Sequence, residues 1–520
     1  MIIQPGPTGP DGVPLISRRS LLKGCSAGFG ALALEGLLGT SSIFADQPTE
    51  PHHAPRAKRV IFLFMHGGPS QVDTFDYKPR LIKDHGKPLS IPLPRVTFAE
   101  PSQYGGVLRS PWEFSQHGES GMWASTLFPH VAGIVDELCF IKSLHGTNDA
   151  HGGALLALHT GSDTFVRPSM GSWIQYGLGE ENSNLPGFIT ICPTLGHGGV
   201  NNWSSGFLPA RYQGTPIGHA GIKAREATIH HLKNEHWNEG LQKLQLELLE
   251  DINLEHLGQR ETDDALEARI RSFELAFQMQ TEAPEVMDLS GESQATLDLY
   301  GIDEEPTDNF GRQCLMARRF AESGVRFIQC THSYKWDQHT NLERDHSNNA
   351  KEVDKPIAGL IKDLKSRGLL EDTLVLWGGE FGRTPMAQDG TGRDHNPHGF
   401  TMWMAGGGVK SGFSYGETDD FGYHAAIDKV HVHDLHATML HLLGIDHERL
   451  TYRYAGRDFV SRMSMVEWSR TSSPETTRSS SSKKRASHGS RARPFSMRPV
   501  GIYQLIPVMI EKLERSEMPS

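Results

Sequence analysis

The feature that most limits how this chain can fold is a series of short apolar runs, each ending in glycine or a polar loop. Residues 59–65 (RVIFLFM) form one such run, which stops at His66-Gly67-Gly68. Short continuous apolar runs with these ends are typical of strands buried on both faces of a parallel sheet. Runs of the same kind occupy residues 138–141, 187–191, 325–330, 373–377 and 400–405.

Helical patterns separate these predicted strands. Residues 154–159, 351–366 and 434–443 have the composition and spacing of helices, and residues 238–300 are rich in Leu, Glu, Gln and Arg at helical spacing. Strands that alternate with helices predict an α/β domain with a mostly parallel central sheet and helices on both faces. We expect this domain to span residues 59–463, with residues 238–300 as a helical insertion that carries no obvious chemistry.

The N-terminus has the pattern of an export signal. Residues 17–23 (SRRSLLK) precede an apolar, small-residue stretch that ends near Leu38, and Ala45 is a plausible cleavage residue. Paired arginines ahead of such a stretch indicate the twin-arginine export machinery. A membrane anchor is the alternative, but the stretch is shorter than the ~20 residues that span a bilayer, and no later segment is long enough. We therefore predict a signal over residues 1–45, a linker over 46–58, and a periplasmic or extracellular protein with no stable membrane span.

Two further compositional features narrow the function and the compartment. A net charge of −11 argues against a nucleic-acid binder, because such proteins carry a positive field that attracts phosphate. Cys139, Cys192, Cys314 and Cys330 are far apart and show no CxxC spacing, so we favour reduced core cysteines and leave one or two disulfides open. Residues 464–520 include a Ser/Arg-rich stretch and are predicted to be a disordered tail.

Histidines and carboxylates gather in loops that follow the predicted strands. The chain has 27 histidines, and four polar clusters hold several of them: residues 66–76, 148–153, 332–339 and 380–398. A lone cluster of this kind is usually an ordinary polar loop. Four of them at strand ends favour a metal site, because a divalent cation needs imidazole and carboxylate ligands that converge from several strands. The mixture of ligand types suits Zn, Mn or Fe better than Ca.

Several longer motifs identify a family. They are HGGPSQVDTFDYKP (66–79), RPSMGSWIQYGLG (167–179), WDQH (336–339), GEFGRTP (379–385), GRDHNP (392–397) and HDLHATMLHLLGID (433–446). With these motifs, residues 58–461 resemble the bacterial domain-of-unknown-function family 1501, which is classed with the alkaline phosphatase-like/sulfatase superfamily. The resemblance implies an alkaline phosphatase-like fold and a site with two divalent metal ions. The metal ligands it implies are His66, Asp73, Asp337, His339, Glu380 and either His395 or His398.

The resemblance also assigns roles to residues that are not ligands, and here the chain departs from the sulfatase pattern. The sulfatase nucleophile run Cys/Ser-x-Pro-Ser-Arg is replaced by His151-Gly152-Gly153-Ala154. His151 is then a metal ligand, a nucleophile of the phosphohistidine type, or a sign that catalysis has been lost. Thr147 and Ser70 are nearby hydroxyl candidates for the nucleophile.

Four side chains outside the predicted ligand set complete the interpretation. Arg383 would hold ester oxygens through a bidentate contact, and the alternative is an ion pair with a neighbouring carboxylate. Lys142 and His145 are further candidates for the mouth of the site. Asp434 is interpreted as a helix cap rather than as a ligand.

These observations predict an exported metal-dependent hydrolase that acts on phosphate or sulfate esters of small molecules or polysaccharides. The alternative is a non-catalytic member of the same fold that binds a metal or an anion and serves as an interaction protein. An oxidoreductase is disfavoured, because no GxGxxG follows a predicted strand.

Overall fold

The computed structural model describes residues 50–94, 98–229 and 282–460, together with short pieces between residues 240 and 280. The predicted signal over residues 1–45 and the predicted tail over 464–520 lie outside the described residues, as does most of the predicted helical insertion. Among the described residues, no helix is both long and apolar enough to cross a membrane.

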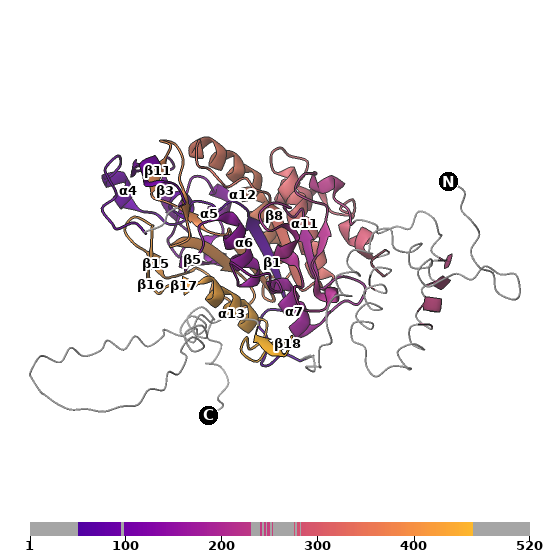
Figure 1. Cartoon of the computed structure of the whole chain (residues 1–520). Helices are drawn as coiled ribbons and strands as arrows, with labels where there is room; N and C mark the ends of the chain where they lie inside the picture. The colour runs from indigo at the N-terminus through magenta and orange to yellow at the C-terminus, as the bar shows by residue number, and fades with distance from the viewer. Residues whose placement is uncertain are drawn as a thin grey trace, which may run out of the picture.

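A central sheet organises the domain (Figure 1). Its strands follow the order β14-β5-β13-β9-β1-β8-β6-β7, and β17 pairs with β5 at one side. Strand β1 (Arg59–Met65) lies between β8 (Phe327–His332) and β9 (Thr373–Gly378) and is parallel to both. The other strands are β5 (Leu138–His145), β6 (Phe188–Ile191), β7 (Thr215–Ile217), β13 (Phe400–Ala405), β14 (Phe413–Tyr415) and β17 (Val430–His431). Strand β13 runs antiparallel to its neighbours β5 and β9, and the other pairings in this sheet are parallel, so the predicted mostly parallel sheet is confirmed.

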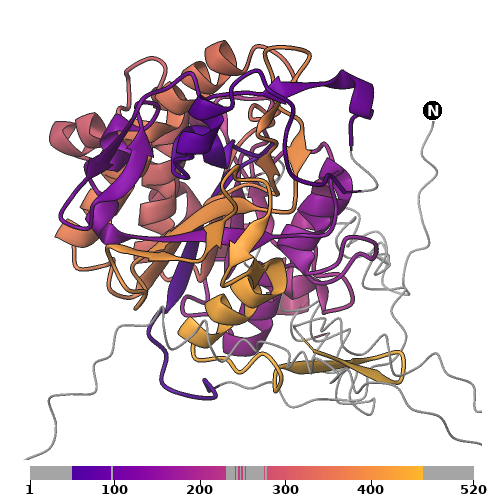
Figure 2. The ribbon, with the colours of Figure 1, turned by 90° about the vertical axis from the view of Figure 1, so that its left-hand side faces the viewer.

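Successive side chains of a strand point to opposite faces of the sheet. Because the strands are apolar on both faces, helices cover the sheet on both sides. In β1, Val60, Phe62 and Phe64 belong to one apolar core, and Ile61, Leu63 and Met65 belong to the other. Figures 1 and 2 show α12 and α13 on opposite sides of the sheet. One face packs against α5 (Pro129–Ala132), α10 (Gln294–Tyr300), α11 (Asp308–Glu322) and α12 (Leu342–Ser366). The other face packs against α6 (His151–Thr160), α7 (Met170–Leu178) and α13 (Val432–Leu442).

Short elements surround the rim of the sheet. Two short helices follow β1, namely α3 (Gln71–Thr74) and α4 (Pro79–Lys83). The two-stranded ladders are β2 (Tyr104–Val107) with β11 (Met386–Gln388), β3 (Phe114–His117) with β4 (Met122–Ser125), β10 (Gly382–Arg383) with β12 (His395–Asn396), β15 (Glu417–Thr418) with β16 (Ala425–Ile427), and β18 (Thr451–Tyr454) with β19 (Arg457–Val460).

Helix α12 begins nine residues before the predicted start at residue 351, at Leu342. The first part of this helix buries Leu342, His346 and Asn349, which share one helical face with Val353. Two of these four side chains are polar, so an apolar pattern cannot reveal that the helix has already begun.

Two smaller predictions are confirmed. The four cysteines are free and buried. Asp434 caps α13, because its carboxylate accepts a hydrogen bond from the backbone N–H of His431 at 2.9 Å.

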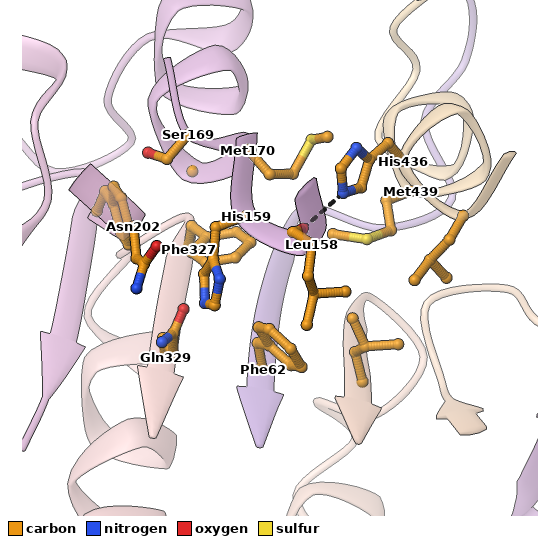
Figure 3. A pocket seen from close by; sticks show the side chains of 14 residues that line it. Phe62, Leu158, His159, Ser169, Met170, Asn202, Phe327, Gln329, His436 and Met439 are labelled. Atoms are coloured by element: carbon orange, nitrogen blue, oxygen red, sulfur yellow. Dashed lines mark hydrogen bonds between the residues drawn. The ribbon is translucent and has the colours of Figure 1, made fainter. Parts of the chain in front are cut away.

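A pocket between the sheet and helices α6, α7 and α13 is lined by the buried histidines His159 and His436 (Figure 3). His436 lies on α13, and its Nε2–H donates to the carbonyl oxygen of Leu158 at 2.7 Å. Burial lowers the pKa of His436 to about 3. The neutral ring is therefore the form that the folded protein accommodates.

This depressed pKa predicts acid sensitivity. Below pH 6.5 the unfolded chain takes up a proton at this residue while the folded chain does not, so stability is lost as the pH falls from 6.5 towards 3. At pH 5 the loss from His436 alone is about 2 kcal/mol. Urea unfolding of His436→Gln, which keeps an N–H donor, is expected to lose less stability between pH 7.5 and pH 5 than the parent protein. Equal losses in the two proteins would contradict this assignment.

Candidate metal centre

The carboxyl ends of the parallel strands bring the candidate side chains together, as open α/β sheets do with their ligand sites. His66 follows β1, His197 follows β6, Asp337 and His339 follow β8, and Glu380 follows β9. His151 is the first residue of α6, which comes after β5, and His395 lies on β12. Three overlapping groups of side chains have possible ligand atoms within 4.8 Å of one another: His66 with His151 and His197, His151 with Asp337 and His395, and His339 with Asp394 and His395.

The turn after β1 needs glycine for the loops to approach this closely. Gly67 has a φ of +117°, and a Cβ at this position would lie 2.7 Å from the backbone nitrogen of Asp337. Both the backbone conformation and the contact exclude a larger residue. The loop after β1 and the loop that carries Asp337 are thereby held against each other.

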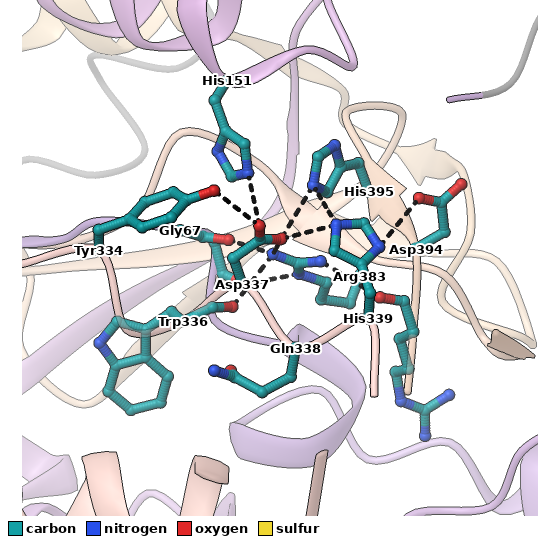
Figure 4. A network of polar contacts seen from close by, with 12 residues as sticks. Gly67, His151, Tyr334, Trp336, Asp337, Gln338, His339, Arg383, Asp394 and His395 are labelled. Atoms are coloured by element: carbon teal, nitrogen blue, oxygen red, sulfur yellow. Dashed lines mark hydrogen bonds and ion pairs between the residues drawn. The ribbon is translucent and has the colours of Figure 1, made fainter. Parts of the chain in front are cut away.

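Asp337 lies at the middle of the cluster (Figure 4). Its Oδ1 is 2.9 Å from His339 Nε2 and 3.0 Å from His395 Nε2, and the two imidazole nitrogens are 3.0 Å apart. Burial by itself would raise the pKa of Asp337. The imidazole of His151 and the guanidinium of Arg383 oppose burial and hold that pKa well below its usual range.

The hydrogen bonds on the far side of these rings determine which nitrogen faces Asp337. His395 Nδ1 is 2.6 Å from the carbonyl oxygen of Asp149, and a carbonyl can only accept, so Nδ1 carries the hydrogen. Burial lowers the pKa of His395 to about 4, so the ring is neutral at pH 7 and its Nε2 presents a lone pair. His339 Nδ1 contacts Gln388 Oε1 at 2.6 Å, and in its neutral form this ring too presents an Nε2 lone pair.

Three electron-pair donors therefore converge. The hydrogen bond from Arg383 to Asp337 Oδ1 offsets part of their repulsion, but the two imidazole nitrogens still face each other at 3.0 Å. A cation bound to nitrogen at about 2.0–2.1 Å in tetrahedral geometry holds its ligand atoms at separations of this order. Two buried polar atoms beside the cluster make only long contacts: His151 Nε2 lies 3.3 Å from Asp337 Oδ2, and Asp394 Oδ1 lies 3.7 Å from His339 Nδ1. The donor set thus fits a divalent cation.

Glu380, another predicted ligand, lies outside the three groups. Both of its carboxylate oxygens accept from the Gly67 N–H, at 3.0 and 3.2 Å, and Oε1 lies 2.7 Å from His151 Nδ1. Burial alone would raise the pKa of Glu380, but the hydrogen bond from His151 and the charges of His66 and His151 lower it to about 2. Glu380 therefore orients His151 in the way that carboxylates orient metal-binding histidines.

A backbone hydrogen bond fixes the orientation of the His66 ring. Its Nδ1 accepts a hydrogen bond from the backbone N–H of Tyr334 at 3.2 Å, so in the neutral ring Nε2 carries the hydrogen. Burial lowers the pKa of His66 to about 4 and thus favours this neutral ring. The ring lies beside His197, with His66 Nε2 and His197 Nδ1 3.5 Å apart.

Arg383 is fully buried and makes the ion pair that was the alternative to ester binding. Its Nη2 donates to Asp337 Oδ1 at 2.7 Å and to the carbonyl oxygen of Trp336 at 3.1 Å. Its Nε donates to the carbonyl oxygen of Gly68 at 3.0 Å. The guanidinium therefore joins the loops after β1 and β8 and positions Asp337.

The predicted ligands Asp73 and His398 lie outside the three groups. Arg393 takes both oxygens of Asp73, with Nε–Oδ2 at 2.7 Å and Nη2–Oδ1 at 3.1 Å, in a pair that is fully buried. His398 packs instead beside Tyr423 and His424.

The two hydroxyl candidates for a nucleophile are engaged elsewhere. Ser70 donates to Asp73, and Thr147 donates to Asp163. Lys142 interacts electrostatically with Asp76, Lys78 and Glu417.

Two residues of the cluster were not among the predicted ligands. His197 lies in a glycine-rich loop (residues 194–199, TLGHGG) just after the predicted strand 187–191, so the rule of histidine at a strand end applied to it as well. Asp394 stands directly before the predicted ligand His395. The general signal was present for both residues.

A family model described as "Protein of unknown function (DUF1501)" matches residues 57–465. The chain belongs to this family. Searching the curated proteins gives no match.

The fold is similar to solved structures at low identity. They include the alkaline phosphatase from the Antarctic bacterium TAB5 (TM-score 0.32, 11% identity, 75% of this chain and 98% of that chain) and the PsFucS1 sulfatase from Pseudoalteromonas sp. (0.31, 12%, 84% and 74%). They also include the lipoteichoic acid synthase LtaP from Listeria monocytogenes (0.35, 9%, 79% and 77%). At these TM-scores we transfer no residue role from them to this DUF1501 protein.

Proposed function

We propose that this DUF1501 protein is an exported hydrolase that uses two divalent cations to cleave phosphate or sulfate esters. The observation that carries the proposal is the convergence of Asp337 Oδ1, His339 Nε2 and His395 Nε2 within 3.0 Å of one another. The export part rests on the paired arginines Arg18 and Arg19 in the N-terminal sequence.

The residues divide into two ligand sets that share Asp337. Asp337 Oδ1, His339 and His395 would hold the first cation, with Asp394 beside them. The other oxygen of Asp337, Oδ2, is 3.3 Å from His151 Nε2, so Asp337, His151 and His197 would hold the second. His66 and Glu380 then position the rings of the second set. Imidazole-rich sets of this kind favour Zn, Mn or Fe over Ca.

Charge supports an anionic substrate. With neutral imidazoles, the three carboxylates of Asp337, Glu380 and Asp394 and the guanidinium of Arg383 give a formal charge of −2, which two divalent cations would reverse to +2. When bound, such cations neutralise an ester anion and polarise the bond that breaks.

The protein's own side chains orient the cluster and link it to the surface. The carboxylate of Glu380 holds His151 Nδ1, which leaves His151 Nε2 directed at the cluster. The hydroxyl of Tyr334 donates to Asp337 Oδ2 at 2.9 Å, and the residue is 44% exposed, so Tyr334 links the cluster to the surface.

A non-catalytic metal-binding protein is the second candidate, and one observation favours it. The hydroxyls of Ser70 and Thr147 are bonded to carboxylates away from the cluster, so neither is placed to act as a nucleophile, and both ring nitrogens of His151 are assigned above to Glu380 and to the second cation. In this alternative the same cation set would stabilise a surface for a partner protein.

Elemental analysis of the purified mature protein, followed by turnover assays with p-nitrophenyl phosphate and p-nitrophenyl sulfate, tests these proposals. We expect two divalent ions per chain and turnover of at least one ester, with turnover lost in His151→Ala. A metal-loaded protein that is inert towards both esters would favour the non-catalytic candidate. A protein without bound metal would contradict both.

A further inference from the structure

Two aromatic side chains are exposed at opposite ends of the metal-binding cluster. Phe98 is 50% exposed, and its ring centroid is 4.2 Å from that of His395 and 5.9 Å from that of His339. Tyr334 is 44% exposed, and its ring centroid is 4.7 Å from those of His66 and His197. Each ring thus packs against candidate ligands or their supports and remains partly open to solvent.

Single exposed apolar residues are common on protein surfaces and need no explanation. Phe98 and Tyr334 differ from ordinary exposed apolar residues because they contact the cluster and because those contacts fix the orientation of their rings. Tyr334 is held by its hydroxyl bond to Asp337 and by its backbone bond to His66. Phe98 covers the ring of His395, which belongs to two of the three donor groups.

The basic side chain that contacts this cluster, among the residues that the structure describes, is Arg383, and it is buried and paired with Asp337. The organic part of a bound ester therefore meets aromatic faces rather than free cations at the rim. Aromatic faces bind flat, apolar surfaces such as other rings, and binding sites commonly combine such walls with a few fixed polar groups.

We propose, building on the function proposed above, that the substrate is an ester of a ring-bearing alcohol, with an aryl group or a sugar ring that stacks on Phe98 or Tyr334. The anionic head of the ester binds at the cations, and the ring reaches one of the two aromatic walls. Phe98 and Tyr334 are thus residues that determine specificity for ring esters over small alkyl esters.

Binding of two non-hydrolysable probes to the metal-loaded protein tests this inference without requiring turnover. Phenylphosphonate carries a ring and methylphosphonate does not, while both present the same anionic group. By isothermal titration calorimetry we expect phenylphosphonate to bind about tenfold more tightly, the size of one good aromatic contact. The preference should fall to about threefold or less in Phe98→Ala or in Tyr334→Ala, whichever wall the ring uses.

Matched variants separate stacking from general damage. Tyr334→Phe keeps the ring and is expected to keep the preference, and Phe165→Ala removes a 61% exposed ring on the loop after α6 and should change nothing. The metal content of every variant shows that the cluster is intact. Equal affinity for the two probes, or a preference that survives in both alanine variants, overturns the inference alone. If a metal-loaded protein binds neither probe, the proposed ester site itself fails.

Discussion

Replacing His395 with alanine is expected to remove one of the two metal ions and to lower kcat/KM for the ester substrate by about a thousandfold. His395 belongs to two of the three donor groups, and its Nε2 lies 3.0 Å from both Asp337 Oδ1 and His339 Nε2. Its orientation is fixed by the bond from Nδ1 to the carbonyl oxygen of Asp149. The rings of Phe98 and Phe381 pack against the imidazole, at centroid distances of 4.2 and 4.4 Å.

His398→Ala is the matched control, since the sequence left His395 and His398 as alternatives for the same role. His398 packs beside Tyr423 and His424 and is absent from the donor groups of the described residues. Elemental analysis and kinetics on the two variants should show about one ion lost in His395→Ala and none in His398→Ala. Loss of metal in the control alone, or in neither variant, would contradict the assignment.

The sheet was predictable because each strand carries its own signal. A strand buried on both faces is apolar along most of its length, as β1 and β9 are after their first residues, Arg59 and Thr373, so the run itself shows where the strand lies. The direction of a strand leaves no such trace. Strand β13 is as apolar as its neighbours and runs antiparallel to them, which depends on the connection and not on its composition.

The sequence suggested candidate ligands mainly where they lie close together in the sequence, on loops that follow strands. The spacing of Asp337 and His339 after β8, and the position of His395 after β10, set three donors on short loops. Carboxylates whose partners lie far away in the sequence make contacts in the structure that the sequence did not predict. Glu380 accepts a hydrogen bond from Gly67, 313 residues away in the sequence, and Asp73 accepts one from Arg393, 320 residues away. No local sequence pattern identifies such distant partners.

The largest effect on stability is expected at Arg383, which sequence reasoning placed at the ester. In Arg383→Met the metal-free protein should lose about 3–5 kcal/mol of unfolding free energy, because the carboxylate of Asp337 and several buried carbonyls lose their donor. Arg383→Lys keeps a charge but cannot reproduce the planar fork that reaches Gly68, Trp336 and Asp337 together, so it should lose part of that stability.

Urea unfolding in the presence of a chelator measures this effect separately from metal and substrate. Arg453→Met is the control: its ion pair with Asp458 is exposed, and removing it should change the unfolding free energy by less than about 1 kcal/mol. The opposite result would be a metal-free Arg383→Met protein as stable as the parent, together with a strongly reduced kcat/KM in the metal-loaded form. It would show that Arg383 binds the ester and does not hold the cluster together. The distinction rests on geometry: a guanidinium committed to Asp337 and to carbonyls on two loops holds the cluster together before any substrate arrives, so its removal has to appear in the free energy of folding.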